Sequence, residues 1–470
     1  MSTALHAYCD AATARCVAPG PAAHHPGFTL AACILASGLA FVDGSVINVA
    51  LPAIGHALDV DAGALQWCIN AYLLPLSAML LLGGAVGDRF GRRRVLILGV
   101  LAFAFASAAC ALTPGLALLL AARFCQGAGA AMLMPNSLAI LGQAFSGAAK
   151  GRAIGAWAAT SAVASAVGPV LGGWLVDLGS WRAIFLINLP LAAGAILLAW
   201  RFAPDNPDGP NTRLDVRGAW LVTIGLGSVT WALTLASGHG WSRTGIGAVI
   251  AGLLLLAAFL LVERHRRDWA LMPLELFASR SLIWLSILTF LLYGALGALL
   301  ILLPYVLIEA CGYSATAAGA ALLPLPLILT VSSPTTGAFA ARAGARVPLA
   351  VGSLLCGLGF LLTLRIHAHA NYWTGVLPAL LVISVGLAST AAPLTTAVLS
   401  SADARNSGAA SGLNSALART GGLLATASLG GVLAPAGGQL LTSFHGAMGI
   451  AALACLGAFL SAIALPIENL

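Results

Sequence analysis

The sequence predicts an all-α membrane protein with fourteen membrane-spanning helices. Hydrophobic residues account for 60% of its 470 residues, charged residues for only 8%, and the mean hydropathy is +0.97. Water-soluble domains are far less apolar than this. A helix needs about 20 apolar residues to cross a bilayer, and fourteen apolar runs of roughly that length follow one another along the chain. We therefore expect the lipid bilayer to surround most of the protein.

The first run follows a tail, residues 1–27, which lacks the basic-then-apolar order of a signal peptide. The expected limits of the fourteen runs are 28–51, 66–86, 95–113, 116–141, 153–176, 183–202, 217–236, 245–263, 281–309, 316–338, 347–365, 373–399, 406–433 and 444–466. An even number of spans places both ends of the chain on the same side of the membrane.

The distribution of Lys and Arg predicts which side that is. If the N-terminus is cytoplasmic, the inner segments hold 17 of the 22 basic residues, and the outer segments hold only Arg182, Arg243 and Arg365. Basic residues gather on the cytoplasmic side of membrane proteins. We therefore expect an inner-membrane protein with a cytoplasmic tail and both termini inside. The basic residues are scattered over short loops, so the net charge of +7 does not indicate a nucleic-acid partner.

The nine cysteines and nine histidines do not indicate a metal or cofactor site. There is no C-x-x-C pair, and several cysteines lie in apolar runs, where small packing residues are expected. The His24-His25 and His367-x-His369 pairs have no Cys or carboxylate neighbours at ligand spacing. We expect no metal and no cofactor.

A short charged stretch, GGAVGDRFGRRRVL at residues 83–96, separates the second and third runs. Charges inside hydrocarbon are expensive, so this stretch must lie in water. It resembles G-x-L-[A/G]-D-[R/K]-x-G-[R/K]-[R/K], the signature between spans two and three of the major facilitator superfamily, and departs from it only at Val86. The resemblance implies the major facilitator fold and a conformational latch at this loop, and a loop that only orients the two helices is the alternative. The implied latch residues are Gly84, Asp88, Arg89, Gly91, Arg92 and Arg93.

An internal repeat predicts how the spans are grouped. GAFAARAGAR at 337–346 repeats GAVGDRFGRR at 84–93 with an offset of 253 residues, and Ala341 stands where the first copy has Asp88. At the same offset Arg152 and Gly155 return as Arg405 and Gly408. We therefore expect two related six-helix halves with the seventh and eighth spans as an insert. The expected parts are a tail at 1–27, a first half at 28–202, a linker and two-helix insert at 203–280, and a second half at 281–470.

The first span carries an acid, Asp43, in the string FVDGSVINVALP at residues 41–52. An acid within a span is a functional candidate by default, although a structural acid that is hydrogen-bonded to a neighbour is the alternative. The string resembles L-D-x-T-[IV]-V-N-V-A-L-P, a signature of the fourteen-span drug:proton antiporters of the EmrB/QacA-like branch. Ser45 replaces the Thr and keeps its hydroxyl group.

The fourth span carries Arg123 and Gln126 in RFCQGAGAA, which resembles the R-x-x-Q-G-x-G-A-A motif of the same family. At 1.5 Å per residue, Asp43 lies about 12 Å and Arg123 about 10 Å below the outer face. A nearby guanidinium favours the ionised carboxylate, and burial favours the protonated one. Because these two effects oppose each other, Asp43 is expected to be a switchable proton carrier. For Arg123 the alternative is an ion pair that serves only helix packing.

The fifth span resembles the antiporter motif G-x₈-G-x₃-G-P-x₂-G-G, with Ala164 in place of the middle Gly. The matching residues are Gly155, Gly168, Pro169, Gly172 and Gly173. Glycines at these intervals allow close helix packing, and Pro169 removes one backbone hydrogen bond and should bend the helix. Generic small-residue packing is the alternative. The resemblance implies export rather than uptake.

Together these features predict a proton-coupled efflux transporter, not an enzyme, that exports small amphipathic, cationic or neutral drugs by alternating access. The residues expected to line its central cavity are Asn48, Trp67, Asn70, Tyr72, Gln126, Met132, Met134 and Asn136. A specific metabolite or antibiotic exporter and a solute:proton symporter are the alternatives on this fold. The sequence leaves open the substrate, the use of a periplasmic adaptor protein, and the roles of Glu309 and Arg419.

Overall fold

The computed structural model describes residues 25–60, 62–204, 215–266, 274–402, 407–433 and 438–466. Most of the predicted tail, most of the linker before the seventh span and both chain ends lie outside these residues. The described part of the chain contains helices and no strand. Its α-helices are α2 (Pro26–Leu58), α3 (Ala62–Phe90), α4 (Arg92–Leu112), α5 (Leu116–Ala144), α6 (Gly147–Asp177), α7 (Ala183–Leu186), α8 (Asn188–Phe202), α9 (Val216–His239), α10 (Arg243–Arg266), α11 (Arg280–Glu309), α12 (Ala315–Ala321), α13 (Pro324–Ala343), α14 (Arg346–Leu362), α15 (Leu377–Ser400), α16 (Ser407–Ala427), α17 (Gly430–Leu433) and α18 (Gly438–Ile463).

Each of the fourteen predicted apolar runs coincides with one or two of these helices. Within the described residues, twelve helical segments are long and apolar enough to cross a membrane, or thirteen if the bent helix α3 counts as one span. Helix α16 is not among them, since Gly, Ala, Ser and Thr make up much of its sequence. The chain is therefore a multi-pass membrane protein, and the number fourteen stays a prediction.

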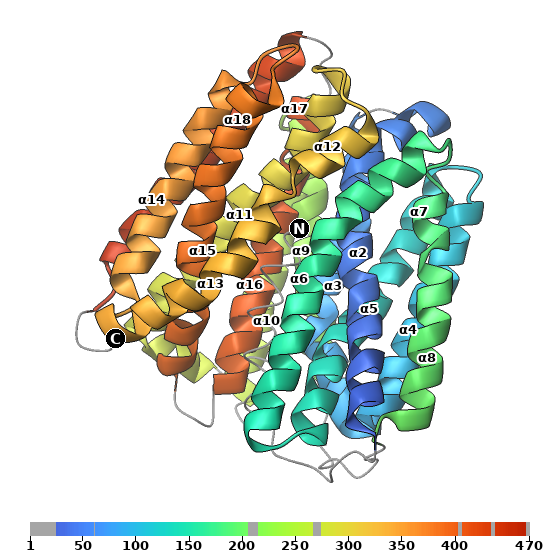
Figure 1. Ribbon diagram of the computed structural model, residues 1–470, viewed down its shortest axis with the longest axis vertical. Helices are drawn as coiled ribbons and strands as arrows, with labels where there is room; N and C mark the ends of the chain where they lie inside the picture. The colour runs from blue at the N-terminus through green and yellow to red at the C-terminus, as the bar shows by residue number, and fades with distance from the viewer. Residues whose placement is uncertain are drawn as a thin grey trace.

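The helices form two groups that have the same internal packing (Figure 1). In the first group α2 packs against α5, α6 and α8, and in the second α11 packs against α15, α16 and α18. The pairs α3–α5 and α4–α8 of the first group correspond to α13–α15 and α14–α18 of the second. The equivalent pairings follow the order of the helices along the chain.

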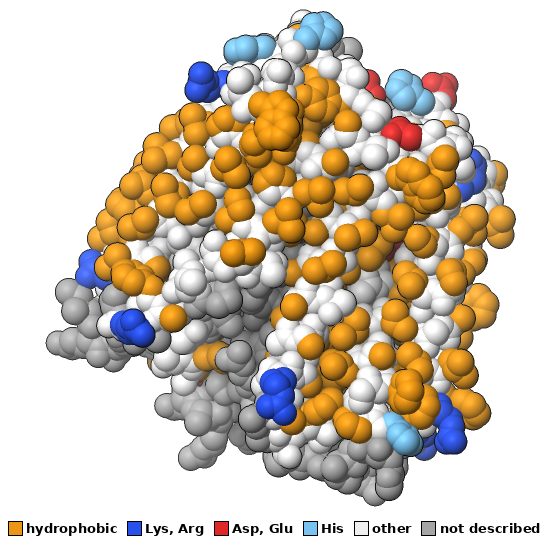
Figure 2. Space-filling model, in the orientation of Figure 1, with side chains coloured by type: hydrophobic (Ala, Val, Ile, Leu, Met, Phe, Trp, Pro, Cys, Tyr) orange, Lys and Arg blue, Asp and Glu red, His pale blue; other side chains and the backbone are white. Residues whose placement is uncertain are grey.

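Helices α9 and α10 pack against each other, and α9 also contacts α3, α16 and α17. It therefore touches both groups. Helix α10 carries exposed apolar side chains, including Ile250, Leu254 and Leu261. Apolar side chains cover the surface of both groups as well (Figure 2). Such a surface is stable only against lipid, which agrees with the composition.

The two ends of the bundle differ in charge. We call them the Arg92 end, where α2 and α4 begin, and the Asp177 end, where α6 finishes. On the face drawn in Figure 2, acidic side chains gather at the Asp177 end (top), whereas most of the Lys and Arg side chains lie at the Arg92 end (bottom). The groups meet through α6 against α12 and α13, α3 against α16, and α2 against α11.

Candidate functional site

A fully buried carboxylate, that of Asp43, lies in the middle of the first group. It is 0% exposed and comes from α2. Its Oδ2 accepts a hydrogen bond from Arg123 Nη1 at 2.5 Å, and its Oδ1 accepts one from Gln126 Nε2 at 2.8 Å. Asn188 Nδ2 donates to the same Oδ1 at 3.2 Å. Three donors from two other helices therefore hold the carboxylate, and a buried polar group needs such partners.

The guanidinium of Arg123 is equally buried and joins one further helix, α3, to the network. Its Nη1 also donates to Gln126 Oε1 at 2.8 Å, and its Nε donates to the backbone carbonyl of Cys68 on α3 at 3.0 Å. Its central carbon lies 4.4 Å from the centre of the Tyr72 ring, a distance that permits a cation–π interaction. Its Nη2 is buried and has no hydrogen-bond partner among the residues that the structure describes.

Ser107 on α4 and Asn188 on α8 complete the network, and sequence analysis did not find them. Ser107 Oγ accepts hydrogen bonds from Gln126 Nε2 at 2.7 Å and from Asn188 Nδ2 at 3.2 Å. Both side chains are 0% exposed. An asparagine in an apolar segment is a recognisable signal for Asn188, because a buried amide needs partners. A single serine in a helix carries no such signal.

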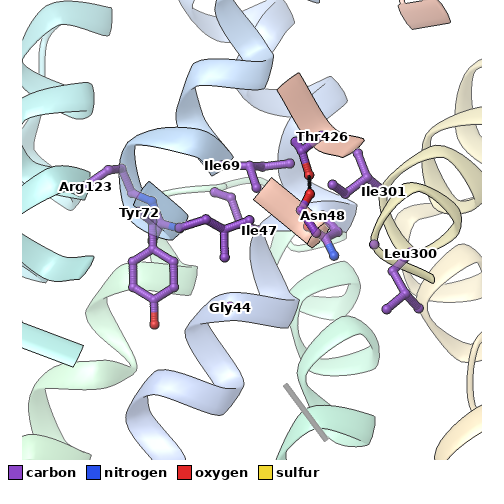
Figure 3. Close-up of a pocket in the computed structure, with 12 residues that line it drawn as sticks. Gly44, Ile47, Asn48, Ile69, Tyr72, Arg123, Leu300, Ile301 and Thr426 are labelled. Atoms are coloured by element: carbon purple, nitrogen blue, oxygen red, sulfur yellow. Dashed lines mark hydrogen bonds between the residues drawn. The ribbon is translucent and has the colours of Figure 1, made fainter. Parts of the chain in front are cut away.

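A small pocket lies beside this network, between the two helix groups. It is lined by Gly44, Ile47, Asn48, Ile69, Tyr72, Leu73, Arg123, Gly297, Leu300, Ile301, Gly422 and Thr426. Figure 3 shows Arg123 and Tyr72 on one side, Asn48 and Thr426 on the other, and Ile47 and Ile69 between them. Arg123 forms part of the wall, whereas Asp43 does not. The guanidinium therefore contacts both the carboxylate and the pocket.

Of the eight residues expected to line a cavity, Asn48 and Tyr72 line this pocket. Gln126 belongs to the buried network instead. Asn70 donates to Thr234 Oγ1 on α9 at 3.5 Å, and Met134 accepts from Arg419 on α16 at 3.0 Å. A helix that is buried on several sides has no periodic pattern that shows which face lines a cavity. Only the packing therefore shows which way these side chains point.

The remaining three predicted lining residues also lie elsewhere. Asn136 Nδ2 donates to the carbonyls of Gly83 at 3.0 Å and Met132 at 2.8 Å. The side chain of Met132 packs close to Gly99 of α4. Trp67 is half-buried on α3 and is not a lining residue of the pocket. These three belong to packing within the first group or to its edge.

The charged stretch after α3 forms a compact turn at the Arg92 end. Asp88 and Arg92 form an ion pair, and Arg93 Nη1 donates to the carbonyl of Ala203 at 3.3 Å. Gly91 adopts φ 95°, a left-handed conformation in which glycine is favoured. A Cβ atom at Gly87 would overlap the amide of Asn136, so this glycine allows α3 to approach α5. Gly84 and Arg89 complete the motif, with Arg89 5.4 Å from the Phe90 ring centre.

The glycines of α6 serve two different contacts. Cβ atoms at Gly168 and Gly172 would collide with Ser45 and Val46 of α2, within the same group. A Cβ atom at Gly173 would collide with the carbonyl of Ala315 on α12, in the other group. Gly155 has open space around it, so no packing requirement explains it here. Pro169 lies inside α6, and its carbonyl lies close to Gly319 of α12.

Glu309 and Arg419, which the sequence left unassigned, both reach from the second group to the first. Glu309 at the end of α11 forms a 3.5 Å contact with His56 Nε2 at the end of α2. Arg419 is 2% exposed and lies on the face of α16 that also carries Gly422 and Thr426. It lies about one turn before Gly422, closer to the Arg92 end. Its contact with Met134 joins α16 to α5.

The fold and the site define a membrane transporter: many apolar helices in two groups with a pocket and buried charges between them. Comparison with known families places the chain more closely. Residues 33–426 match the model of the Major Facilitator Superfamily, so the chain belongs to this superfamily of transporters and is not an enzyme. The fold agrees, since a peptide transporter solved in complex with sulfate superposes with a TM-score of 0.72 and 16% sequence identity over 94% of both chains.

Several relatives are named for resistance or export. The multidrug resistance protein Stp of Mycobacterium tuberculosis (strain CDC 1551 / Oshkosh) is 32% identical over 86% of this chain and 75% of its own length. The methylenomycin A resistance protein of Bacillus subtilis (strain 168) is 32% identical over 85% of this chain and 86% of its own. The cephamycin export protein CmcT of Amycolatopsis lactamdurans is 33% identical over 83% and 82%, respectively. These names are consistent with an efflux transporter.

The network predicts unequal costs for two substitutions of its uncharged members. Gln126→Leu removes one partner each from Asp43 and Arg123, and hydrogen bonds to charged groups contribute about 1.5–3 kcal/mol each. Ser107→Ala removes only an acceptor shared by two neutral amides, which is worth about 1 kcal/mol. Thermal unfolding in detergent should therefore show a clearly larger loss of stability for Gln126→Leu. Equal losses would contradict the assignment of Gln126 as the bridge between the two charges.

Proposed function

We propose that this protein is a proton-coupled efflux transporter that exports small amphipathic compounds by alternating access. The observation that carries the proposal is the buried pair of Asp43 and Arg123, in which the acid is enclosed by three donors and the guanidinium also forms part of a pocket wall between the two helix groups. A buried acid with a charged partner, placed next to a pocket, suits a group that must gain and lose a proton.

The repeated packing supports two six-helix halves, residues 28–202 and 281–470, with α9 and α10 as an insert, and hence fourteen spans. In alternating access the two halves rock about a site at their interface. The excess of basic residues at the Arg92 end favours a cytoplasmic location of that end, which places the Asp177 end outside. Both termini would then lie in the cytoplasm.

The contact of Arg123 with both Asp43 and the pocket supplies a physical route for coupling. When Asp43 is ionised, it offsets the charge of the guanidinium. When a proton binds Asp43, that charge is no longer offset and raises the positive potential in the pocket. The charge of Asp43 and the charge of a cationic substrate about 6 Å away, at an effective dielectric constant of about 20, would interact by about 3 kcal/mol. Proton entry would thus weaken the binding of a cationic substrate about 100-fold, as exchange requires.

Two features support export. The glycine motif of α6 resembles that of antiporters, and the relatives described above carry names that refer to resistance or export.

We further propose that the turn at residues 84–93 acts as the latch of the cytoplasmic side. Its acid, Asp88, has an ion-pair partner in the same turn, Arg92, which it can exchange for a neighbouring helix end in another conformation.

The first functional prediction concerns the proton carrier. Asp43→Asn holds the neutral form permanently, so proton release driven by a drug gradient in proteoliposomes should be lost while the protein still folds. Arg123→Ala removes the charge that favours ionisation, so the pH optimum of efflux should move upward.

Glu309→Gln is the matched control, because Glu309 lies at the surface of the bundle end, away from the network, and should leave the coupling intact. Full coupling in Asp43→Asn would contradict the assignment of the carrier. An unshifted pH profile in Arg123→Ala would show that Arg123 serves only helix packing.

A second prediction concerns the latch. Asp88→Asn should reduce turnover several-fold while drug binding and expression stay near those of the unchanged protein, because the residue lies far from the pocket. The readouts are efflux rate and equilibrium drug binding on the same preparation. Unchanged efflux would mean that the turn serves only to orient the helices.

A third prediction tests the orientation. Single cysteines at Ser2 and at Asn469 should react with a membrane-impermeant thiol reagent only after the cells are opened, since both ends are expected in the cytoplasm. Labelling of either position in intact cells would overturn the proposed topology.

A further inference from the structure

Helix α6 of the first group is tied to helix α12 of the second by a single side chain at the Asp177 end. Asp177 is the last residue of α6. Its Oδ1 accepts a hydrogen bond from the backbone N–H of Ala315 at 3.2 Å, and its Oδ2 accepts from the N–H of Thr316 at 2.9 Å. The hydroxyl of Thr316 donates to the same Oδ2 at 2.5 Å. Both carboxylate oxygens are therefore used in a contact between the two helix groups.

The backbones behind this contact pack without intervening side chains. A Cβ atom at Gly173, one turn before Asp177, would collide with the carbonyl of Ala315. A Cβ atom at Gly319, one turn after Ala315, would collide with the carbonyl of Pro169. Close backbone packing of this kind excludes water and is lost as a unit when the helices separate. The carboxylate of Asp177 lies at the exposed rim of the interface, where it can be released to water.

We propose that Asp177 is a positioning residue of the transport cycle: a clamp that closes the Asp177 end of the protein by holding the start of α12. The inference rests on the alternating access proposed above. In the conformation described here the clamp is made, and the proposal assigns this conformation to the state that is closed toward the Asp177 end. Opening toward that side requires α6 and α12 to part, and the three hydrogen bonds of Asp177 must then be exchanged for bonds to water.

The size of the expected effect follows from the exposure of the contact. Hydrogen bonds to a charged group are stronger than those between neutral groups, but water competes for an exposed carboxylate. Loss of the charge should therefore shift the balance between the closed and open states by about tenfold and leave the fold intact. His56 and Glu309 also join the two groups at this end, but His56 is 80% exposed, so the effect of this pair should be smaller.

The test measures access to the pocket from outside. A cysteine is introduced at Thr426, which lines the pocket, and its rate of reaction with a membrane-impermeant maleimide is followed in right-side-out vesicles. In this background Asp177→Asn should raise the rate about tenfold, because the change removes the charge and one of the two acceptor oxygens. Thr316→Ala should raise the rate less, and Thr316→Ser, which keeps the hydroxyl, should leave it unchanged.

Asp59→Asn is the matched control. Asp59 is an exposed acid at the same end, in the loop after α2. Its backbone N–H donates to the carbonyl of Gly55, but its side chain makes no hydrogen bond or ion pair within the described part of the chain. Its φ of 51° suits asparagine as well as aspartate, so the substitution changes the charge alone. The same labelling in the chain without the Thr426 cysteine measures the contribution of the native cysteines.

The proposal is overturned if Asp177→Asn labels at the rate of Asp59→Asn, or if Thr316→Ser labels like Thr316→Ala. Thermal unfolding of each variant shows whether a raised rate comes from loss of the fold, which would also count against the clamp. The outcome is separate from that of the proton carrier. A raised rate in Asp177→Asn, together with undiminished coupling in Asp43→Asn, would support the clamp and refute the proposed carrier.

Discussion

The buried ion pair of Asp43 and Arg123 is the interaction on which the rest of the first helix group depends. Two charges in a hydrocarbon-like interior are tolerated only when each has partners for its hydrogen bonds. Three further groups meet that need directly, the amides of Gln126 and Asn188 and the carbonyl of Cys68, and the hydroxyl of Ser107 accepts hydrogen bonds from both amides. They come from α3, α4, α5 and α8, so the pair fixes the relative positions of five helices, including α2.

The glycines are the second constraint, because they set how closely helices approach. Gly127 lets α5 approach the backbone of Tyr72 on α3, which brings the Arg123 guanidinium against the Tyr72 ring. Gly168 and Gly172 seat α6 on α2 next to Asp43, and Gly173 seats the same helix on α12 of the other group. One glycine-rich helix thus packs against both α2, which carries Asp43, and α12 of the other group.

Some of the site could be predicted from the sequence, because charged residues in apolar runs are rare and costly. Asp43 and Arg123 were recognisable for this reason, and counting residues along two antiparallel helices placed them at similar depth; the structure brings them into contact. Asn188 and Ser107 were missed because small polar side chains occur in many helices, and only packing shows which way they point. Asp177 was not singled out from the sequence, because its partners lie about 140 residues further along the chain.

The sequence by itself determined that the chain lies in a membrane and which charged residues are costly in free energy to bury. Hydropathy is additive along the chain, so apolar segments, their approximate ends and the buried charges can be read residue by residue. The tertiary structure alone decided which faces of those helices meet. A helix buried all round has no periodic pattern to mark its faces, so Met134 and Asn136, expected in the cavity, pack against Arg419 and Gly83. Contacts between distant helices depend on the combined shape of both surfaces, which no single stretch of sequence contains.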